Sequence, residues 1–271
     1  MFSDEPGLGN PLAVVIGADG LTDEQMRRFA RWTNLSETTF VLAPGAGADY
    51  RVRIFTPDGE LPFAGHPTLG TCHAWLETGG RPASGDVIVQ ECGAGLVPIR
   101  RTEAGLAFAA PPLVRSGPVD EPLAERVAGL LGIGRGDIVD LQWADNGPGW
   151  LAVLLASAEE VLALQPGPVD LDLGVAGLYP AGSPVALEVR AFTPKLLSAG
   201  EDPVTGSLNA SLAQWLLASG RLRAPYVASQ GTVLGRRGRV HISADDDGAA
   251  GDGQVWVGGA TRTLIEGTVS L

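Results

Sequence analysis

The chain has 271 residues, of which 45% are hydrophobic and 18% charged, a balance typical of a globular protein that needs no disulfide framework. Its 31 acidic and 19 basic residues give a net charge of −12, which disfavours nucleic acid and anionic membranes as partners. No apolar run approaches the roughly 18 residues of a membrane span, and no signal-peptide pattern is present, so we expect a cytoplasmic protein.

The predicted elements are many short strands and few helices, separated by 38 glycines and 20 prolines. Thr22 and Gln25 form a capping box that predicts a helix through about Trp32, with Asn34 as its C-cap. Residues 37–42 alternate like a half-buried strand. The other predicted strands are residues 12–16, 50–55, 87–91, 96–100, 151–155, 185–192, 255–258 and 263–269.

An internal repeat divides the chain. Residues 53–57 match residues 190–194 at an offset of 137, and residues 66–71 match residues 202–207 at an offset of 136. In both copies a strand, a loop and an apolar helix follow one another. We therefore expect two related halves, residues 1–112 and 113–271, separated near the prolines at 111 and 112.

Each copy of the repeat predicts an anion-binding loop. A proline followed by Gly70-Thr71 or Gly206-Ser207 is expected to lead into the start of a buried helix, where backbone N–H groups bind anions. The residue before each proline, His66 or Asp202, can exchange protons. This pattern favours acid–base chemistry on a carboxylate. The alternative is that the loops only turn the chain and cap the helices.

Several common sites are missing from the sequence. The only lysine, Lys195, follows no glycine-rich phosphate loop, and no complete dinucleotide fingerprint, Gly-x-Ser-x-Gly or His-Glu-x-x-His motif occurs. We therefore expect neither a cofactor nor a metal ion. A racemase with two catalytic thiols is disfavoured, because the second loop contains no cysteine and Cys72 is expected to be a buried filler inside a helix.

Four segments together resemble the PhzF-like family of phenazine biosynthesis, and the resemblance spans nearly the whole chain. The segments are Asn10-Pro11-Leu12-Ala13-Val14-Val15, Leu35-Ser36-Glu37-Thr38-Thr39-Phe40, Phe63-Ala64-Gly65-His66-Pro67-Thr68-Leu69-Gly70 and Gly200-Glu201-Asp202-Pro203-Val204-Thr205-Gly206-Ser207. The resemblance implies the α+β diaminopimelate-epimerase fold, in which two pseudo-symmetric halves each wrap a sheet around a central helix. It also implies an active site in the cleft between the halves, a last strand that can cross back to the first half, and a homodimer.

The resemblance also assigns roles to individual residues. Glu37 corresponds to the glutamate that moves a proton between two substrate carbons, while His66 and Asp202 correspond to the residues that orient and polarise it. The substrate-binding candidates are Gly65, Gly70, Thr71, Gly206 and Ser207. The alternating pattern independently places Glu37 on one side with Thr39 and Val41, where burial would raise the pKa of its carboxyl group. Substrate-defining candidates without a motif are Trp143, Asp145, Asn146 and Tyr179.

The sequence thus predicts a cofactor-independent isomerase that acts on a small carboxylate by general acid–base catalysis. An alternative from another class is a catalytically silent protein that binds small carboxylates with the same fold. A hydrolase or lyase acting on a similar acid is a third candidate, which would change the mass of its product.

Overall fold

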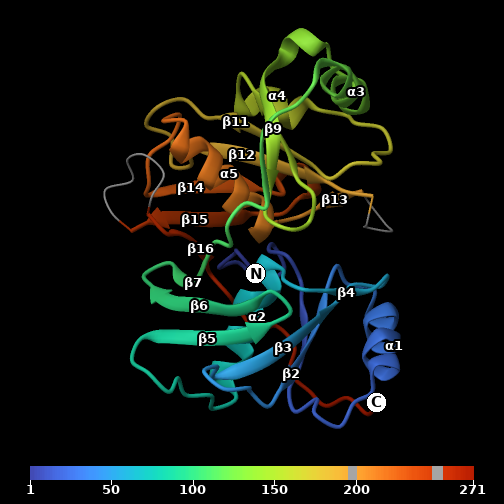
Figure 1. Ribbon diagram of the computed structural model, residues 1–271, viewed down its shortest axis with the longest axis vertical. Helices are drawn as coiled ribbons and strands as arrows, with labels where there is room; N and C mark the ends of the chain where they lie inside the picture. Colours follow the sequence, from blue (N-terminus) through green and yellow to red (C-terminus); the bar gives the residue numbers. More distant parts are fainter. Residues whose placement is uncertain (195–199, 246–252) are drawn as a thin grey trace. The chain divides into compact units, whose positions relative to one another are not determined.

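The computed structural model describes residues 1–194, 200–245 and 253–271, so Lys195 lies outside the described residues. The chain divides into two compact units (Figure 1). Unit 1 consists of residues 1–109 and 258–271, and unit 2 consists of residues 110–257. Within the described residues, no helix is both long and apolar enough to cross a membrane.

Unit 1 is built around helix α2, whose residues 65–72 are all buried. Its strands follow the order β1-β2-β3-β5-β6-β7, with β4 paired to β3. A cluster of apolar side chains lies under α1 and contains Met26, Phe40 and Phe55. The elements are β1 (Ala13–Val15), α1 (Asp23–Thr33), β2 (Thr38–Leu42), β3 (Tyr50–Phe55), β4 (Glu60–Leu61), α2 (Gly65–Glu77), β5 (Val87–Cys92), β6 (Gly95–Thr102) and β7 (Gly105–Ala109).

Unit 2 is built in the same way around helix α5, whose residues 206–213 are all buried. Its strands follow the order β8-β9-β10-β11-β12-β14-β15, with β13 paired to β12. The elements are β8 (Arg115–Pro118), α3 (Glu121–Leu131), the 3₁₀ turn η1 (Arg135–Asp137), β9 (Ile138–Asp145), β10 (Leu151–Leu155), α4 (Ala158–Ala163), β11 (Leu173–Leu178), β12 (Leu187–Phe192), β13 (Glu201–Asp202), α5 (Gly206–Ala218), β14 (Tyr226–Gln230), the 3₁₀ turn η2 (Thr232–Leu234) and β15 (Gly238–Ala244). Strand β16 (Val255–Gly259) begins in unit 2 and ends in unit 1.

The two units share one succession of elements, which begins at β1 in the first and at β10 in the second. Strands β1 and β2 pair in parallel, as do β10 and β11. The next pairs, β2 with β3 and β11 with β12, are antiparallel. Strands β3 and β5 then pair in parallel across a central helix, as do β12 and β14. This repeated pairing is an internal duplication of the fold.

A repeated Arg–Glu pair fixes the alignment of the two units. Arg53 on β3 makes two hydrogen bonds of 2.6–2.7 Å to Glu60 on β4, and Arg190 on β12 makes two of 2.7–2.9 Å to Glu201 on β13. Ile54 pairs with Leu61, and Ala191 pairs with Asp202 at the same place in the second unit. The offset therefore grows from 137 in the strands to 141 after them, because residues 193–200 replace a loop of half that length.

The larger offset corrects one prediction from the repeat. The sequence comparison aligned His66 with Asp202, but α2 begins at Gly65 and α5 begins at Gly206. In the fold, His66 therefore corresponds to Ser207. Asp202 instead corresponds to Leu61, because each lies at the second position of the short strand before the helix. The match between residues 66–71 and residues 202–207 was an accident of composition.

Predictions that rest on a few neighbouring residues agree with the structure. Helix α1 has Thr22 as its N-cap with the expected capping box to Gln25, and Asn34 as a left-handed C-cap. Strands β3 and β10 have the predicted bounds. Strand β2 is buried on both faces rather than one, because Phe40 packs in the cluster under α1 while Thr39 contacts α2.

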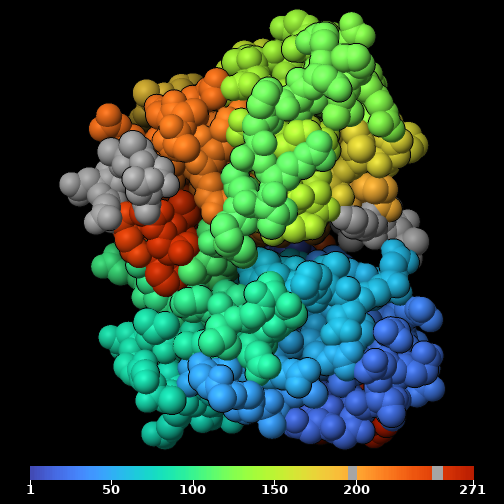
Figure 2. Space-filling model, in the orientation of Figure 1, coloured from blue at the N-terminus to red at the C-terminus, as the bar shows by residue number. Residues whose placement is uncertain are grey.

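The predicted strand at residues 263–269 was wrong. Residues 260–271 form no strand and lie extended along unit 1, with Leu264 and Ile265 exposed. In Figures 1 and 2 this segment is red, and its end emerges beside the blue residues of the N-terminal part. Leu271 packs against the cluster under α1, and the hydroxyl of Thr263 bonds His73 of α2. These side-chain contacts, rather than strand pairing, hold the segment.

Candidate active site

Glu37 lies directly before β2 and faces helix α2. It is on the same side of the strand as Thr39, whose Oγ1 accepts a hydrogen bond of 2.8 Å from Thr71 of α2. The carboxylate oxygen Oε2 of Glu37 lies 3.3 Å from Nε2 of His66, and the Glu37 side chain is only 15% exposed. The structure therefore brings together two of the three predicted catalytic residues.

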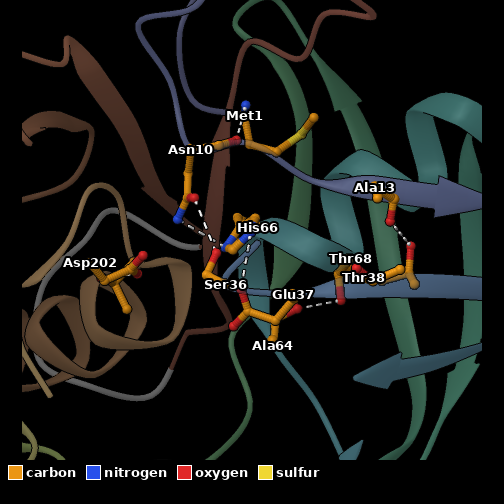
Figure 3. Close-up of polar contacts among 12 residues, drawn as sticks. Met1, Asn10, Ala13, Ser36, Glu37, Thr38, Ala64, His66, Thr68 and Asp202 are labelled. Atoms are coloured by element: carbon orange, nitrogen blue, oxygen red, sulfur yellow. Dashed lines mark hydrogen bonds and ion pairs between the residues drawn. The ribbon is translucent and has the colours of Figure 1, made fainter. Parts of the chain in front are cut away.

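His66 is the second residue of α2 and is held from its other side by Asn10. The Nδ1 atom of His66 lies 3.3 Å from Nδ2 of Asn10, and Ser36 donates a hydrogen bond of 3.4 Å to Oδ1 of the same amide (Figure 3). Asn10 thus contacts the ring nitrogen of His66 other than the one that lies beside Glu37. Asn10 belongs to one of the segments that resemble the family, but the sequence assigned it no role.

Burial of the His66 ring lowers its pKa to about 3, the positive charge of the amino terminus adds to this shift, and a hydrogen bond with the Pro11 backbone opposes it. Since the pKa in the unfolded chain is near 6.5, the unfolded state alone takes up the proton between about pH 6.5 and 3. We therefore expect His66 to destabilise the fold progressively as the pH falls through this range, by about 2 kcal/mol between pH 7 and pH 5.

The measurement is urea unfolding of the wild type and of His66→Gln at pH 7 and pH 5. The stability difference between the two proteins should shift by about 2 kcal/mol in favour of the variant at the lower pH. The other two histidines are present in both proteins and cancel. A difference that does not change with pH would contradict the low pKa.

Asp202, the third predicted catalytic residue, belongs to a buried polar network in unit 2. Its Oδ2 accepts a hydrogen bond of 2.6 Å from Oγ1 of Thr205, the N-cap of α5. Gln230 on β14 donates to the backbone oxygen of Asp202 and to Oγ1 of Thr205, and accepts from the Thr205 backbone and from Asn209. Gln230 thus fixes the residues that join β13 to α5. The sequence offered no sign of it, because its partners lie 21 to 28 residues away.

Ser207, in the first turn of α5, is held by the loop between β9 and β10. Asn146 donates a hydrogen bond of 3.0 Å to its backbone oxygen, and the Trp150 indole donates one of 3.1 Å to its hydroxyl. Asp145 accepts bonds of 2.7 Å from the backbone of Gly147 and Gly149, both at positive φ angles that favour glycine. Two candidates without a motif, Asp145 and Asn146, therefore shape the surroundings of a predicted binding residue.

Gly65 and Gly206 occupy equivalent places, because each is the first residue of its buried helix. Neither helix has a side-chain hydrogen bond at its N-cap, Ala64 or Thr205, so no cap covers its first backbone N–H groups. Such groups attract anions. The geometry of these two glycines is compatible with the predicted anion contact in both units.

Gly70 and Thr71 do not lie at a helix start, contrary to prediction. Both are in the second turn of α2, where backbone N–H groups bond within the helix. A Cβ atom on Gly70 would come within 2.6 Å of the Leu12 side chain, so this glycine serves close packing. The Thr71 hydroxyl is buried against Thr39. The error follows from the misaligned repeat, which matched Gly70 to Gly206.

The remaining candidates, Cys72, Trp143 and Tyr179, are buried or contact neighbouring side chains. Cys72 is fully buried, as predicted, and burial raises the pKa of its thiol to about 12. Trp143 stacks under the Arg115 guanidinium, and the Tyr179 hydroxyl donates to Glu188. Across the described ranges, no three His, Cys, Asp or Glu side chains gather in a group that could hold a metal ion.

Comparisons with known proteins assign the family. The profile of a family described as phenazine biosynthesis-like protein matches residues 1–267. The chain belongs to this PhzF-like family. It is 35% identical to antisense-enhancing sequence 1 of Schizosaccharomyces pombe, over 98% of the chain and 95% of that protein. It is also 35% identical to trans-2,3-dihydro-3-hydroxyanthranilate isomerase of Pseudomonas aeruginosa, over 91% of the chain and 89% of that protein.

The fold agrees with this assignment. A crystal structure of a PhzF-family protein from Enterococcus faecalis covers all of the chain, and the chain covers 96% of it, with a TM-score of 0.77 and 26% identity. The predicted α+β fold of the diaminopimelate-epimerase type is therefore confirmed for this PhzF-like protein. Relatives of the family carry isomerase and epimerase names, and the chain is an isomerase.

Proposed function

We propose that this PhzF-like isomerase moves a proton on a small carboxylate by general acid–base catalysis, without a cofactor, and that Glu37 carries the proton. The observation that carries the proposal is the contact of 3.3 Å between Oε2 of Glu37 and Nε2 of the buried His66. Because burial lowers the pKa of His66 to about 3, its ring is uncharged near neutral pH, and the Glu37 carboxylate is not neutralised by a cation at this contact. It therefore remains able to accept a proton.

The proposed reaction conserves every atom of the substrate. The Glu37 carboxylate removes a proton from one carbon and becomes a carboxylic acid, while the electron pair of the broken C–H bond stays on the substrate. Glu37 then returns a proton to a second carbon, so the product has the mass of the substrate. The negative charge that develops between the two steps needs hydrogen-bond donors close to the substrate.

The starts of the two central helices, α2 and α5, support the proposal that the substrate carries a carboxylate. The first turns at Gly65 and at Gly206-Ser207 have no side-chain cap, and a helix N-terminus favours an anion. Asp202, whose side chain accepts a hydrogen bond from the N-cap of α5, is proposed to orient the substrate.

We also propose that the protein is cytoplasmic and forms a homodimer. Light scattering of the purified protein at micromolar concentration is the direct test of the dimer.

The experiment is incubation of the protein in deuterated water with a panel of carboxylated metabolites, scored by mass spectrometry. The panel includes trans-2,3-dihydro-3-hydroxyanthranilate, which the Pseudomonas aeruginosa relative is named for. We expect at least one compound to gain deuterium at carbon while its atoms are otherwise conserved. Binding without exchange would favour a silent binding protein, and a product of different mass would favour a hydrolase or a lyase.

A further inference from the structure

The C-terminal segment, residues 260–271, is extended but has no neighbouring strand. Among the described residues, the backbone groups of residues 262–270 make no backbone–backbone hydrogen bond, and all nine residues are exposed. Leu264 is 57% and Ile265 is 92% exposed, although β-branched residues such as Ile265 favour strands. An exposed extended segment whose N–H and C=O groups are unpaired is a template for pairing with another strand.

The contacts that hold this segment leave one of its faces to solvent. Thr263 points towards α2, where its hydroxyl contacts His73 at 3.2 Å. Side chains alternate between the two faces of an extended chain, so Arg262, Leu264 and Glu266 share the opposite face. That face carries a basic, an apolar and an acidic side chain in this order.

The solvent face is complementary to itself when two copies run antiparallel. With Leu264 opposite the same residue of a second copy, Arg262 of each chain lies opposite Glu266 of the other. Arg262 donates to the backbone oxygen of Asp4 at 3.4 Å, but neither charge has an ion-pair partner in the described part of its own chain. A shift of the pairing by one residue would lose both charge pairs, so the charges select a single register.

We propose that the two protomers of the homodimer pair through residues 260–268 as antiparallel strands, about a twofold axis at Leu264. The occupant of the open segment is then a second copy of this chain, and the contact is isologous. A two-stranded ribbon is marginally stable on its own. Here the contacts of Thr263 and Leu271 already order each strand, which lowers the entropy cost of pairing. The inference rests on the proposed homodimer and names its contact.

Charge reversal tests this register, with the dissociation constant of the dimer measured by analytical ultracentrifugation. Arg262→Glu and Glu266→Arg each place like charges opposite one another twice, and each should raise the dissociation constant at least about 10-fold. An equimolar mixture of the two variants should form a heterodimer with the affinity of the wild type, because every facing pair then joins Arg to Glu. The two positions lie about 13 Å apart in one extended chain, so this recovery cannot arise within a chain.

A cysteine at the proposed axis tests the same contact by distance. In Leu264→Cys the facing Cα atoms would lie about 4.5–5.5 Å apart, a separation that a disulfide spans, so mild oxidation should cross-link the dimer. Val269→Cys is the matched control. Val269 is also exposed, but its two copies would lie about 30 Å apart in this register and should not cross-link. Cys72 and Cys92 are present in both variants.

The outcomes separate this contact from the other proposals. A dimer whose affinity is unchanged by both charge reversals, or a mixture that does not recover it, would overturn the pairing while the homodimer stands. A wild type that is monomeric throughout the micromolar range would overturn the homodimer and the pairing together. The isomerase reaction is tested separately by deuterium exchange, so its failure would leave the pairing intact.

Discussion

Replacing Glu37 by Gln is expected to lower the rate of deuterium exchange into the substrate by about 10²–10⁴-fold, the range that general acid–base groups contribute. The amide keeps the size of the carboxylate and can still contact His66, 3.3 Å away, but it cannot carry a proton between carbons. Ligand affinity should change by less than about 3-fold, because the helix starts that would hold the carboxylate are untouched. Single-turnover exchange and calorimetry give the two values.

Glu77→Gln is the control for this variant. Glu77 also lies near a histidine of α2, with its Oε2 3.2 Å from Nε2 of His73, but its side chain is half exposed. The exchange rate of this variant should match that of the wild type. Unchanged exchange in Glu37→Gln, or an equal loss in both variants, would refute the catalytic role of Glu37.

Replacing Arg190 by Met is expected to lower the free energy of unfolding by about 3–5 kcal/mol. The guanidinium makes two bonds to the buried Glu201, and its NH1 donates to the backbone oxygens of Val161 and Leu164 at the end of α4. Without Arg190 the Glu201 carboxylate stays buried and loses the two hydrogen bonds from the guanidinium. Urea unfolding at pH 7 measures the loss.

The duplicated pair in unit 1 is the matched control. Arg53 binds Glu60 with the same two bonds, but the side chain of Glu60 is 35% exposed against 7% for Glu201. Water can solvate the exposed Glu60 carboxylate once its Arg partner is gone. Arg53→Met should therefore lower the free energy of unfolding by only about 1 kcal/mol. The double variant Arg190→Met with Glu201→Leu should recover part of the loss. Equal losses at Arg53 and Arg190 would contradict the dependence on burial.

The sequence predicts elements whose signal lies within a few residues. The capping box of Thr22 and Gln25 fixes the start of α1, because both hydrogen bonds join residues three apart. The segment at 263–269 is rich in Thr, Leu, Ile and Val yet forms no strand. Strand propensity expresses how well a residue fits an existing sheet, and here side chains of α2 and the cluster under α1 hold the segment instead.

The candidate site was predictable only in part. Glu37 and His66 were found through the family resemblance, and the alternation of the strand placed Glu37 on the same side as Thr39, which in the structure faces α2. The alignment of His66 with Asp202 failed because four additional residues before β13 shift the register of the repeat. Asn10 and Asn146 act on residues 56 and 61 positions away in the chain. Contacts of that range leave no periodic signal in the sequence.

The assignment of residues 258–271 to the first unit has a consequence for synthesis on the ribosome. An emerging chain that has reached residue 109 still lacks Thr263, which anchors to α2, and Leu271, which packs under α1. The N-terminal unit therefore cannot be completed before the C-terminal one has been translated, and its apolar surface stays open during that interval. The unit that begins first along the chain is therefore the last to have all of its residues synthesised.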